Sequence, residues 1–455
     1  MAMPQIDNYL PNVRSQYEAL PYPPCNPEDD RTRLVQTWLE DLPMINHYCF
    51  AGKQSFKNSF RALVAGGGTG DASIFLAEQL RDTNAQIVHL DMSAASMAIA
   101  QSRANIRGLS NITWVHDSLL NLPALGLGEF DYINCSGVLH HLADPDAGFN
   151  ALRAVLKPNG KGNCSNAGAG AIGLMVYATA GRTAVYQTQA LMRLVNQASL
   201  QGRDAQRDIA RTKDILASLP ASNWFVRSQE LHHDQHMGDA GIYDLLLHSQ
   251  DRSYSVGELF DWLEHNTGSG PLAGHCMHLT FSDVQRGRSP YLPHMVLGSK
   301  PPAMAAQLRA LPMRQQYQMA ELMIGNIITH SLYATQSADC TALYGDAGYI
   351  PFFYHEPLTG AAAAQVFDTN RGKPFRLHHQ HSGVSVMVDP GRYGAKILAL
   401  IDGEKTFAEI FNHFRADWTG QAAAPDDAAL FADFADTYNT LNALERLLLR
   451  HSSCR

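Results

Sequence analysis

The sequence predicts an α/β fold in which helices cover both faces of a mostly parallel sheet. Three observations lead to this fold class. The apolar run Arg61–Ala65 breaks into glycines and then becomes a helical pattern from Asp71. Helix starts are predicted after Ser93 and at Asp144-Pro145. Further strand-like runs lie at 86–91, 112–118 and 130–136. Strands that alternate with helices are typical of a parallel sheet.

Glycines dominate the turn after the first predicted strand. Gly66, Gly67, Gly68 and Gly70 let backbone amides approach a ligand at the start of the next helix. A dinucleotide-binding loop, G-x-G-x-x-G, would need glycine where Asp71 stands. A phosphate-binding P-loop would need a lysine after Gly70, and none follows. The spacing that remains is G-x-G-x-G.

An acidic residue ends each of the next two predicted strands. Asp91 closes the run Q-I-V-H-L-D, 21 residues after Gly70. A carboxylate at the carboxyl end of a strand can accept hydrogen bonds from both hydroxyls of a ribose, as an adenosyl ligand requires. Asp117 closes the third run and is placed to accept a hydrogen bond from an adenine amino group. The order of these residues predicts a site for an adenosyl ligand.

These segments also resemble a known family. V-A-G-G-G-T-G, L-D-M-S, H-D-S, V-L-H-H-L-A-D-P and L-K-P-N-G, over residues 60–180, are similar to the motifs of class I S-adenosylmethionine-dependent methyltransferases. The resemblance implies a Rossmann-like sheet, S-adenosylmethionine as cofactor, and methyl transfer to an oxygen, nitrogen or carbon acceptor. The cofactor-binding residues that it implies are Gly66, Gly68, Gly70, Asp91, Met92, Asp117, Ser118 and Ser136.

The chain departs from the pattern of this family in two places. Val64 stands where an acid is usual at the end of the first strand, so one contact to the amino-acid moiety of the cofactor must come from elsewhere. Lys161–Gly170 is an insertion before the fifth predicted strand. Its small residues are typical of a flexible loop.

A segment rich in tyrosine and proline precedes the predicted sheet. Residues 1–60 are expected to form a helical lead or cap. The stretch Y-E-A-L-P-Y-P-P resembles the lead of a methyltransferase subgroup that lies over the cofactor, so Tyr17 and Tyr22 are expected to bind substrate. The alternative is an extended proline-rich strap that only packs against the domain.

Helical patterns within 183–256 predict a substrate lid. Apolar residues recur at helical spacing over 188–200 and 205–219. An insertion after the fifth strand would lie over the carboxyl edge of the sheet, where ligands bind. A polar group near its end is expected to face the substrate and consists of Asp251, Arg252 and Tyr254, with His248 as a catalytic candidate. The alternative is a buried turn held by an Asp–Arg pair.

Two histidines follow the fourth predicted strand, beside the expected site of methyl transfer. His140 is a candidate base for a hydroxyl or amine acceptor, whereas His141 is expected to pack at the entry to a helix. Because the sulfonium methyl group is already activated, alignment of the acceptor should supply most of the catalysis. A closed, dry pocket beneath a lid would favour the loss of charge during transfer.

Composition and charge narrow the expected partners. A net charge of −8 argues against a nucleic-acid binder. The seven cysteines form no C-x-x-C pair and are expected to be reduced thiols in the cytoplasm. Neither a signal peptide nor a membrane span is expected. No histidine cluster has a recognised metal-ligand spacing, so no metal is expected. These observations favour a cytoplasmic enzyme with a small-molecule or peptide acceptor.

Residues 301–455 are expected to form a C-terminal domain, separate from a methyltransferase domain over 61–300. The segment 393–410 predicts a helix, a turn at Asp402-Gly403 and a second helix capped by Thr406. This pattern favours a winged-helix-like module. Its many acidic residues argue against DNA binding and favour a homodimer interface. The alternative to an enzyme is a non-catalytic scaffold that keeps the cofactor fold and acts through this region.

Overall fold

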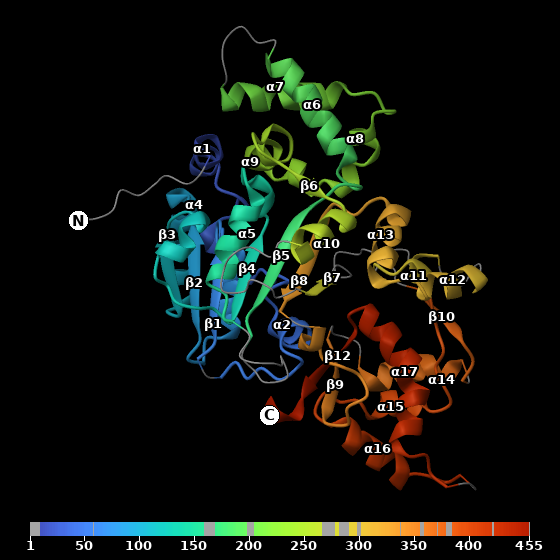
Figure 1. Ribbon diagram of the computed structural model, residues 1–455. Coiled ribbons are helices and arrows are strands. Elements are labelled where there is room, and N and C mark those ends of the chain that lie inside the picture. The colour runs from blue at the N-terminus through green and yellow to red at the C-terminus, as the bar shows by residue number, and fades with distance from the viewer. Residues whose placement is uncertain are drawn as a thin grey trace.

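A mixed eight-stranded sheet forms the centre of the protein (Figure 1). The strand order is β3-β2-β1-β4-β5-β8-β7, and β6 pairs with β5. Strands β1 to β6 are parallel to their neighbours, whereas β8 is antiparallel to β5 and β7 to β8. The strands are β1 (Arg61–Ala65), β2 (Gln86–Asp91), β3 (Ile112–His116), β4 (Tyr132–Ser136), β5 (Ala171–Ala178), β6 (Ser253–Tyr254), β7 (His278–Phe281) and β8 (Thr329–Thr335). The predicted parallel α/β sheet is confirmed.

The structure is a computed structural model. It covers residues 10–57, 59–158, 169–197, 204–265, 278–281, 291–297, 302–336, 338–354, 359–370, 372–378, 385–420 and 423–454. Most of the predicted insertion Lys161–Gly170 lies outside the described residues.

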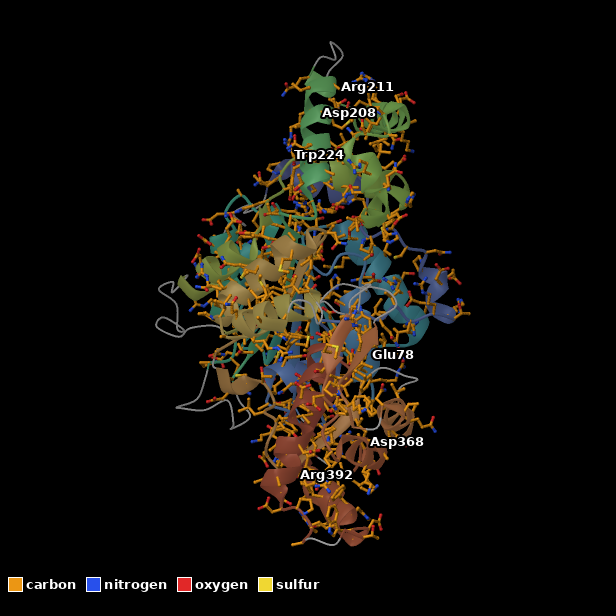
Figure 2. All side chains as sticks on the ribbon, turned by 90° about the vertical axis from the view of Figure 1, so that its right-hand side faces the viewer. Glu78, Asp208, Arg211, Trp224, Asp368 and Arg392 are labelled. Atoms are coloured by element: carbon orange, nitrogen blue, oxygen red, sulfur yellow. The ribbon has the colours of Figure 1, made fainter. Side chains whose placement is uncertain are left out.

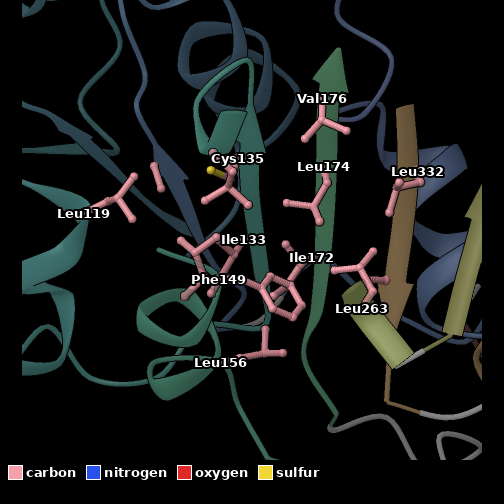
Figure 3. Close-up of a cluster of buried hydrophobic side chains, with 14 of the residues drawn as sticks. Leu119, Ile133, Cys135, Phe149, Leu156, Ile172, Leu174, Val176, Leu263 and Leu332 are labelled. Carbon is pink, nitrogen blue, oxygen red and sulfur yellow. The ribbon is translucent and has the colours of Figure 1, made fainter. Parts of the chain in front are cut away.

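Helices cover both faces of the sheet because the strands alternate large apolar residues between two cores. On one face, Ile133 and Leu174 pack with Phe149 and Leu263 (Figure 3). On the other face, Val64 belongs to the second core. The helices that pack against the sheet are α2 (Leu42–Cys49), α3 (Asp71–Gln79), α4 (Ala94–Arg107), α5 (Pro145–Ala154) and α10 (Val256–His265), and α1 (Pro11–Ala19) packs against α4. Sheets buried on both faces are typical of parallel α/β folds.

The insertion between β5 and β6 is helical, as predicted. It forms one end of the molecule, where Trp224 is labelled in Figure 2, and the C-terminal helices form the opposite end. Its helices are α6 (Thr183–Gln197), α7 (Ala205–Ser218), α8 (Trp224–Arg227), α9 (Gly238–Ile242) and the π-helix Tyr243–Leu247. A π-helical turn is rare and is often found at functional sites.

The C-terminal region has a core of its own, built around Ile397, Phe407, Phe411 and Phe434. Thr406 and Glu409 form a capping box at the start of α16, which confirms the predicted helix, turn and capped helix. A winged-helix arrangement and a dimer interface stay predictions. The elements after β7 are α11 (Pro293–Val296), α12 (Pro302–Arg309), α13 (Met313–Ile324), β9 (Tyr349–Phe353), α14 (Gly360–Thr369), β10 (Phe375–His378), β11 (Ser385–Val388), α15 (Gly394–Leu400), α16 (Phe407–Ala416), α17 (Asp427–Ala443) and β12 (Leu447–His451).

One cysteine departs from the sequence prediction. Cys340 is disulfide-bonded, so the prediction that all seven cysteines are reduced thiols is wrong at this position. A spacing pattern detects only cysteines that are close in sequence, and it carries no information about pairs that the fold brings together.

Among the helices of the described ranges, none is long and apolar enough to cross a membrane.

His47 joins the N-terminal part of the chain to the C-terminal part. Its Nδ1 lies 3.0 Å from the amide nitrogen and 3.2 Å from the carbonyl oxygen of Leu449 in β12, and its Nε2 lies 3.1 Å from Nδ2 of Asn442 in α17. The ring is fully buried, and this burial lowers its pKa to about 4. A doubly protonated ring would turn an N–H at Nε2 toward the amide donor of Asn442 and an N–H at Nδ1 toward the backbone of Leu449, which also presents a donor, so the folded state favours the neutral ring.

This histidine should make the protein sensitive to acid. The unfolded chain takes up the proton near the ordinary pKa of 6.5, whereas the folded chain takes it up only near 4. Stability is therefore lost as the pH falls below 6.5, and His47 alone should contribute a loss of about 2 kcal/mol between pH 7 and pH 5. Chemical unfolding at both pH values should show a smaller loss for His47→Gln. His413→Gln, at an exposed position, is the control, and an unchanged loss in His47→Gln would contradict this assignment.

Candidate functional site

The glycine loop after β1 approaches neighbouring residues so closely that side chains on Gly66 and Gly68 cannot fit. Gly66 has φ 77° and Gly68 has φ 51°. A Cβ atom on Gly66 would lie 2.3 Å from a methyl carbon of Val138, and one on Gly68 would lie 2.8 Å from the carbonyl oxygen of Tyr22. The loop therefore presents bare backbone to the cavity beside it.

Asp91 fixes the conformation of this loop. Its Oδ2 accepts a hydrogen bond from the Gly68 amide at 2.7 Å, and its Oδ1 accepts one from the Ser93 amide at 2.8 Å. Each carboxylate oxygen can accept a further hydrogen bond. Burial raises the pKa of Asp91, while the two amide donors act in the opposite direction. The carboxylate is thus held where ribose hydroxyls could reach it.

Asp117 is oriented in a similar way at the end of β3. Its Oδ1 accepts hydrogen bonds from the Ser118 amide and from Nδ2 of Asn121, both at 2.7 Å. Of the eight predicted cofactor residues, seven line one cavity: Gly66, Gly68, Asp91, Met92, Asp117, Ser118 and Ser136. Gly70 does not line it, because it packs beneath α4, where a Cβ atom would lie 2.8 Å from that of Ala100.

The cavity extends from the carboxyl edge of the sheet to the lid. Its volume is about 1470 Å³, and the lid contributes Arg182, Asp234, Met237 and Asp244 to its wall. Sites for one small ligand usually have volumes of roughly 300–1,000 Å³. The space is therefore sufficient for a cofactor and a second ligand together.

The N-terminal segment connects the glycine loop to the lid. Tyr22 donates a hydrogen bond to Asp234 Oδ1 at 2.8 Å, and the following carbonyl oxygen of Pro23 accepts one from Thr69 Oγ1 at 2.8 Å. Tyr17 accepts a hydrogen bond from Ser93 Oγ at its carbonyl oxygen. Both predicted tyrosines line the cavity, so this segment lies over the predicted cofactor site.

Tyr17, His141, Asp244 and His248 form a buried polar cluster at the lid side of the cavity. Potential ligand atoms of His141, Asp244 and His248 lie within 4.8 Å of one another. The two imidazole rings stack with their centroids 3.9 Å apart. Asp244 accepts hydrogen bonds from the hydroxyls of Tyr17 at 3.0 Å and Tyr177 at 3.3 Å. Burial raises the pKa of Asp244.

The backbone of Gln250 sets opposite tautomers in the two histidines. Its carbonyl oxygen lies 2.8 Å from His141 Nδ1, which must therefore carry the hydrogen and leave a lone pair on Nε2. Its amide donates to His248 Nδ1 at 3.1 Å, so the hydrogen of that ring is on Nε2, 3.4 Å from the Tyr17 hydroxyl. Burial lowers the pKa of His248 to about 2, and the ring is neutral at pH 7. His141 is thus a proton acceptor and His248 a donor.

The tautomers of His141 and His248 affect how well the cluster could bind a metal ion. A histidine that ligates a metal usually donates its other ring N–H to an acceptor. His141 meets this condition, but His248 accepts at Nδ1 and would have to change its tautomer. The cluster is therefore better suited to proton transfer than to holding an ion.

Neither of the two predicted catalytic histidines, His140 and His248, lines the cavity. His140 is fully buried, and neither ring nitrogen has a hydrogen-bond partner among the described residues. Its ring stacks on Tyr177 with centroids 3.9 Å apart, and burial lowers its pKa. His141, which the sequence predicted to be a packing residue, lines the cavity instead.

The predicted polar group at 251–254 also lies outside the cavity wall. Asp251 is buried and pairs with Arg182 at 3.4 Å, and it accepts a hydrogen bond from Gln189 at 3.0 Å. The guanidinium of Arg252 is exposed and lies 4.6 Å from the ring centroid of Tyr254. This arrangement matches the alternative of a buried turn, with Arg182 as the partner in place of Arg252.

Sequence reasoning missed several residues of the cavity. Arg182, Asp234 and Asp244 come from the lid, and Tyr177 comes from the end of β5. None of them belongs to a motif with a fixed spacing. The only available signal was the position of the insertion over the carboxyl edge, which predicts that some lid residues face the ligand.

Residues 63–161 match the family model described as a methyltransferase domain. This match agrees with the glycine loop and the two aspartates. The chain contains a class I S-adenosylmethionine-dependent methyltransferase domain. The cavity residues fit the cofactor, because the glycine loop lines the cavity and Asp91 and Asp117 offer oriented carboxylates.

Similar proteins cover different parts of this methyltransferase. An uncharacterized protein of Synechococcus sp. is 32% identical over 324 residues, which are 71% of this chain and 70% of that protein. The ubiquinone biosynthesis O-methyltransferase of Albidiferax ferrireducens is 30% identical over 120 residues, 26% of this chain and 43% of that enzyme. The chain thus spans less than half of that relative. The structure of PKMT2 from Rickettsia typhi shares the fold with a TM-score of 0.56 and 15% identity, over 91% of this chain and 76% of that chain.

Removal of the Asp91 carboxylate should weaken cofactor binding. Asp91→Ala loses the group that fixes the loop and accepts from the ribose, and the affinity for S-adenosylhomocysteine should fall by about tenfold or more. Calorimetric titration of the full chain measures this change. Asp82→Ala, at an exposed turn, is the control. Equal affinities in Asp91→Ala and the control would show that the ribose is not held at this edge.

Proposed function

We propose that this methyltransferase acts on a hydroxyl or amine of a small molecule or peptide, bound between the lid and the cofactor, and that His141 accepts the proton of that group. The observation that carries this proposal is the shared cavity. The glycine loop and Asp91 line the same cavity as His141 and Asp244. A base beside the expected methyl group is useful only when the acceptor carries a proton at the reacting atom.

The reaction would proceed as a direct transfer. As the acceptor heteroatom forms a bond to the methyl carbon, the bond between that carbon and sulfur breaks, and the heteroatom proton moves to Nε2 of His141. The lone pair for this proton is available because Nδ1 is held by the carbonyl oxygen of Gln250. The imidazolium that forms would be stabilised by the nearby carboxylate of Asp244.

Aromatic side chains supply the surface against which the acceptor would be aligned. Tyr17, Tyr22 and Tyr177 line the cavity, together with the buried guanidinium of Arg182. Rigid aromatic walls reduce the freedom of a bound ligand and so favour alignment for transfer. Oxygen acceptors are the first to test, because the relatives in the cofactor region are named O-methyltransferases.

The proton-acceptor role of His141 predicts a specific kinetic defect. With a panel of phenols, amines and peptides, formation of S-adenosylhomocysteine identifies an acceptor. In His141→Gln the kcat for that acceptor should fall by about 10²–10⁴-fold, with little change in cofactor affinity. The remaining rate should rise with pH, because a deprotonated acceptor no longer needs the base.

His236→Gln is the matched control, because His236 is an exposed lid residue that does not line the cavity. A kcat in His141→Gln equal to that of the control would eliminate His141 as the base. Cofactor binding without turnover of any acceptor in the panel would favour the non-catalytic scaffold.

A further inference from the structure

The segment before α2 places a buried carboxylate in the cavity wall. Glu40 is only 2% exposed, and it lines the cavity together with Val64, Gly66 and Asn134. Glu40 lies 24 residues before Val64 in the chain, so it belongs to a different segment from the glycine loop. Burial of a carboxylate is costly unless its charge serves a partner.

Hydrogen bonds to β4 and α3 position this carboxylate. Asn134 Nδ2 donates to Oε1 of Glu40. The backbone of the segment is held on both sides, because the Tyr132 hydroxyl donates to the carbonyl oxygen of Leu39 and Gln79 Nε2 donates to that of Glu40 at 2.9 Å. The carboxylate therefore occupies a built position and is not a chance surface group.

The strand register relates Glu40 to the rest of the cofactor site. Val64 in β1 is paired with Asn134 in β4. Val64 lies two residues before Gly66, and Asn134 lies two residues before Ser136. Along the carboxyl edge, in the strand order β3-β2-β1-β4, the groups follow as Asp117, Asp91, the glycine loop and Glu40. An adenosyl cofactor that begins with adenine at Asp117 and ribose at Asp91 reaches Glu40 with its amino-acid end.

The chemistry at that end calls for a carboxylate. The methionine moiety of the cofactor carries an α-ammonium, and a hydrogen bond between charged groups is stronger than one between neutral groups. Val64 cannot make this contact. We infer that Glu40 binds the α-ammonium of S-adenosylmethionine and so replaces an acid at the end of β1. This inference rests on S-adenosylmethionine being the cofactor.

A pair of ligands isolates this contact. S-adenosylhomocysteine carries the α-ammonium, whereas 5′-methylthioadenosine has the same nucleoside and sulfur but lacks the amino-acid moiety. Calorimetric titration of the full chain with both ligands measures this contact. In Glu40→Gln the affinity for S-adenosylhomocysteine should fall by about tenfold or more, and the affinity for 5′-methylthioadenosine should stay nearly unchanged. The substitution keeps the size of the side chain and removes only its charge.

Asp41→Asn is the matched control, because it neutralises the adjacent carboxylate, which accepts from Tyr354 and does not line the cavity. Both affinities should stay as in the unaltered chain. The inference would be overturned if Glu40→Gln lost equal affinity for the two ligands or lost affinity for neither. It would also be overturned if Glu40→Gln bound S-adenosylhomocysteine more tightly, because that result is expected when Glu40 lies beside the carboxylate of the ligand and not beside its ammonium. If the unaltered chain binds 5′-methylthioadenosine but not S-adenosylhomocysteine, the cofactor assignment fails instead.

Discussion

The carboxylate of Asp91 is the group on which the geometry of the site depends. It joins the amide of Gly68 in the loop after β1 to the amide of Ser93 at the start of α4. This connection requires that β1 and β2 are parallel neighbours, so that their carboxyl ends meet. It also requires glycine at 66 and 68, since side chains there would collide with Val138 and the Tyr22 backbone. The ligand-binding edge is thus a direct consequence of the sheet.

The part of the cavity wall around Asp244, where the methyl acceptor is proposed to bind, depends on a different kind of interaction. Residues far apart in the chain meet there through hydrogen bonds between buried polar groups, such as Tyr17 with Asp244. The backbone of Gln250 makes one ring, His141, a proton acceptor and the other, His248, a donor. Such networks are specific because an unpaired buried polar group is costly. The insertion between β5 and β6 thereby contributes buried polar groups to the cavity wall.

The cofactor site also draws on elements outside the glycine motif. Tyr22 contacts the loop from the N-terminal segment, and Glu40 reaches the cavity from the segment before α2. Because Asn134 holds Glu40 in place, the fourth strand orients a group that the first strand does not provide. This division of roles explains how the chain can lack an acid at Val64 and still offer a charged contact for an amino-acid moiety.

Local sequence patterns were sufficient to predict the parallel sheet, the glycine loop and the acids at the ends of β2 and β3. These features depend on local spacing, on the alternation of strands and helices, and on the rule that parallel strands end at one edge. Local patterns also predicted the capped helix at Thr406. By contrast, the packing of the folded chain places His141 at the cavity and His140 in the interior, and it pairs Asp251 with Arg182. Adjacent residues differ in burial, and distant residues form pairs, through packing between elements that no local pattern encodes.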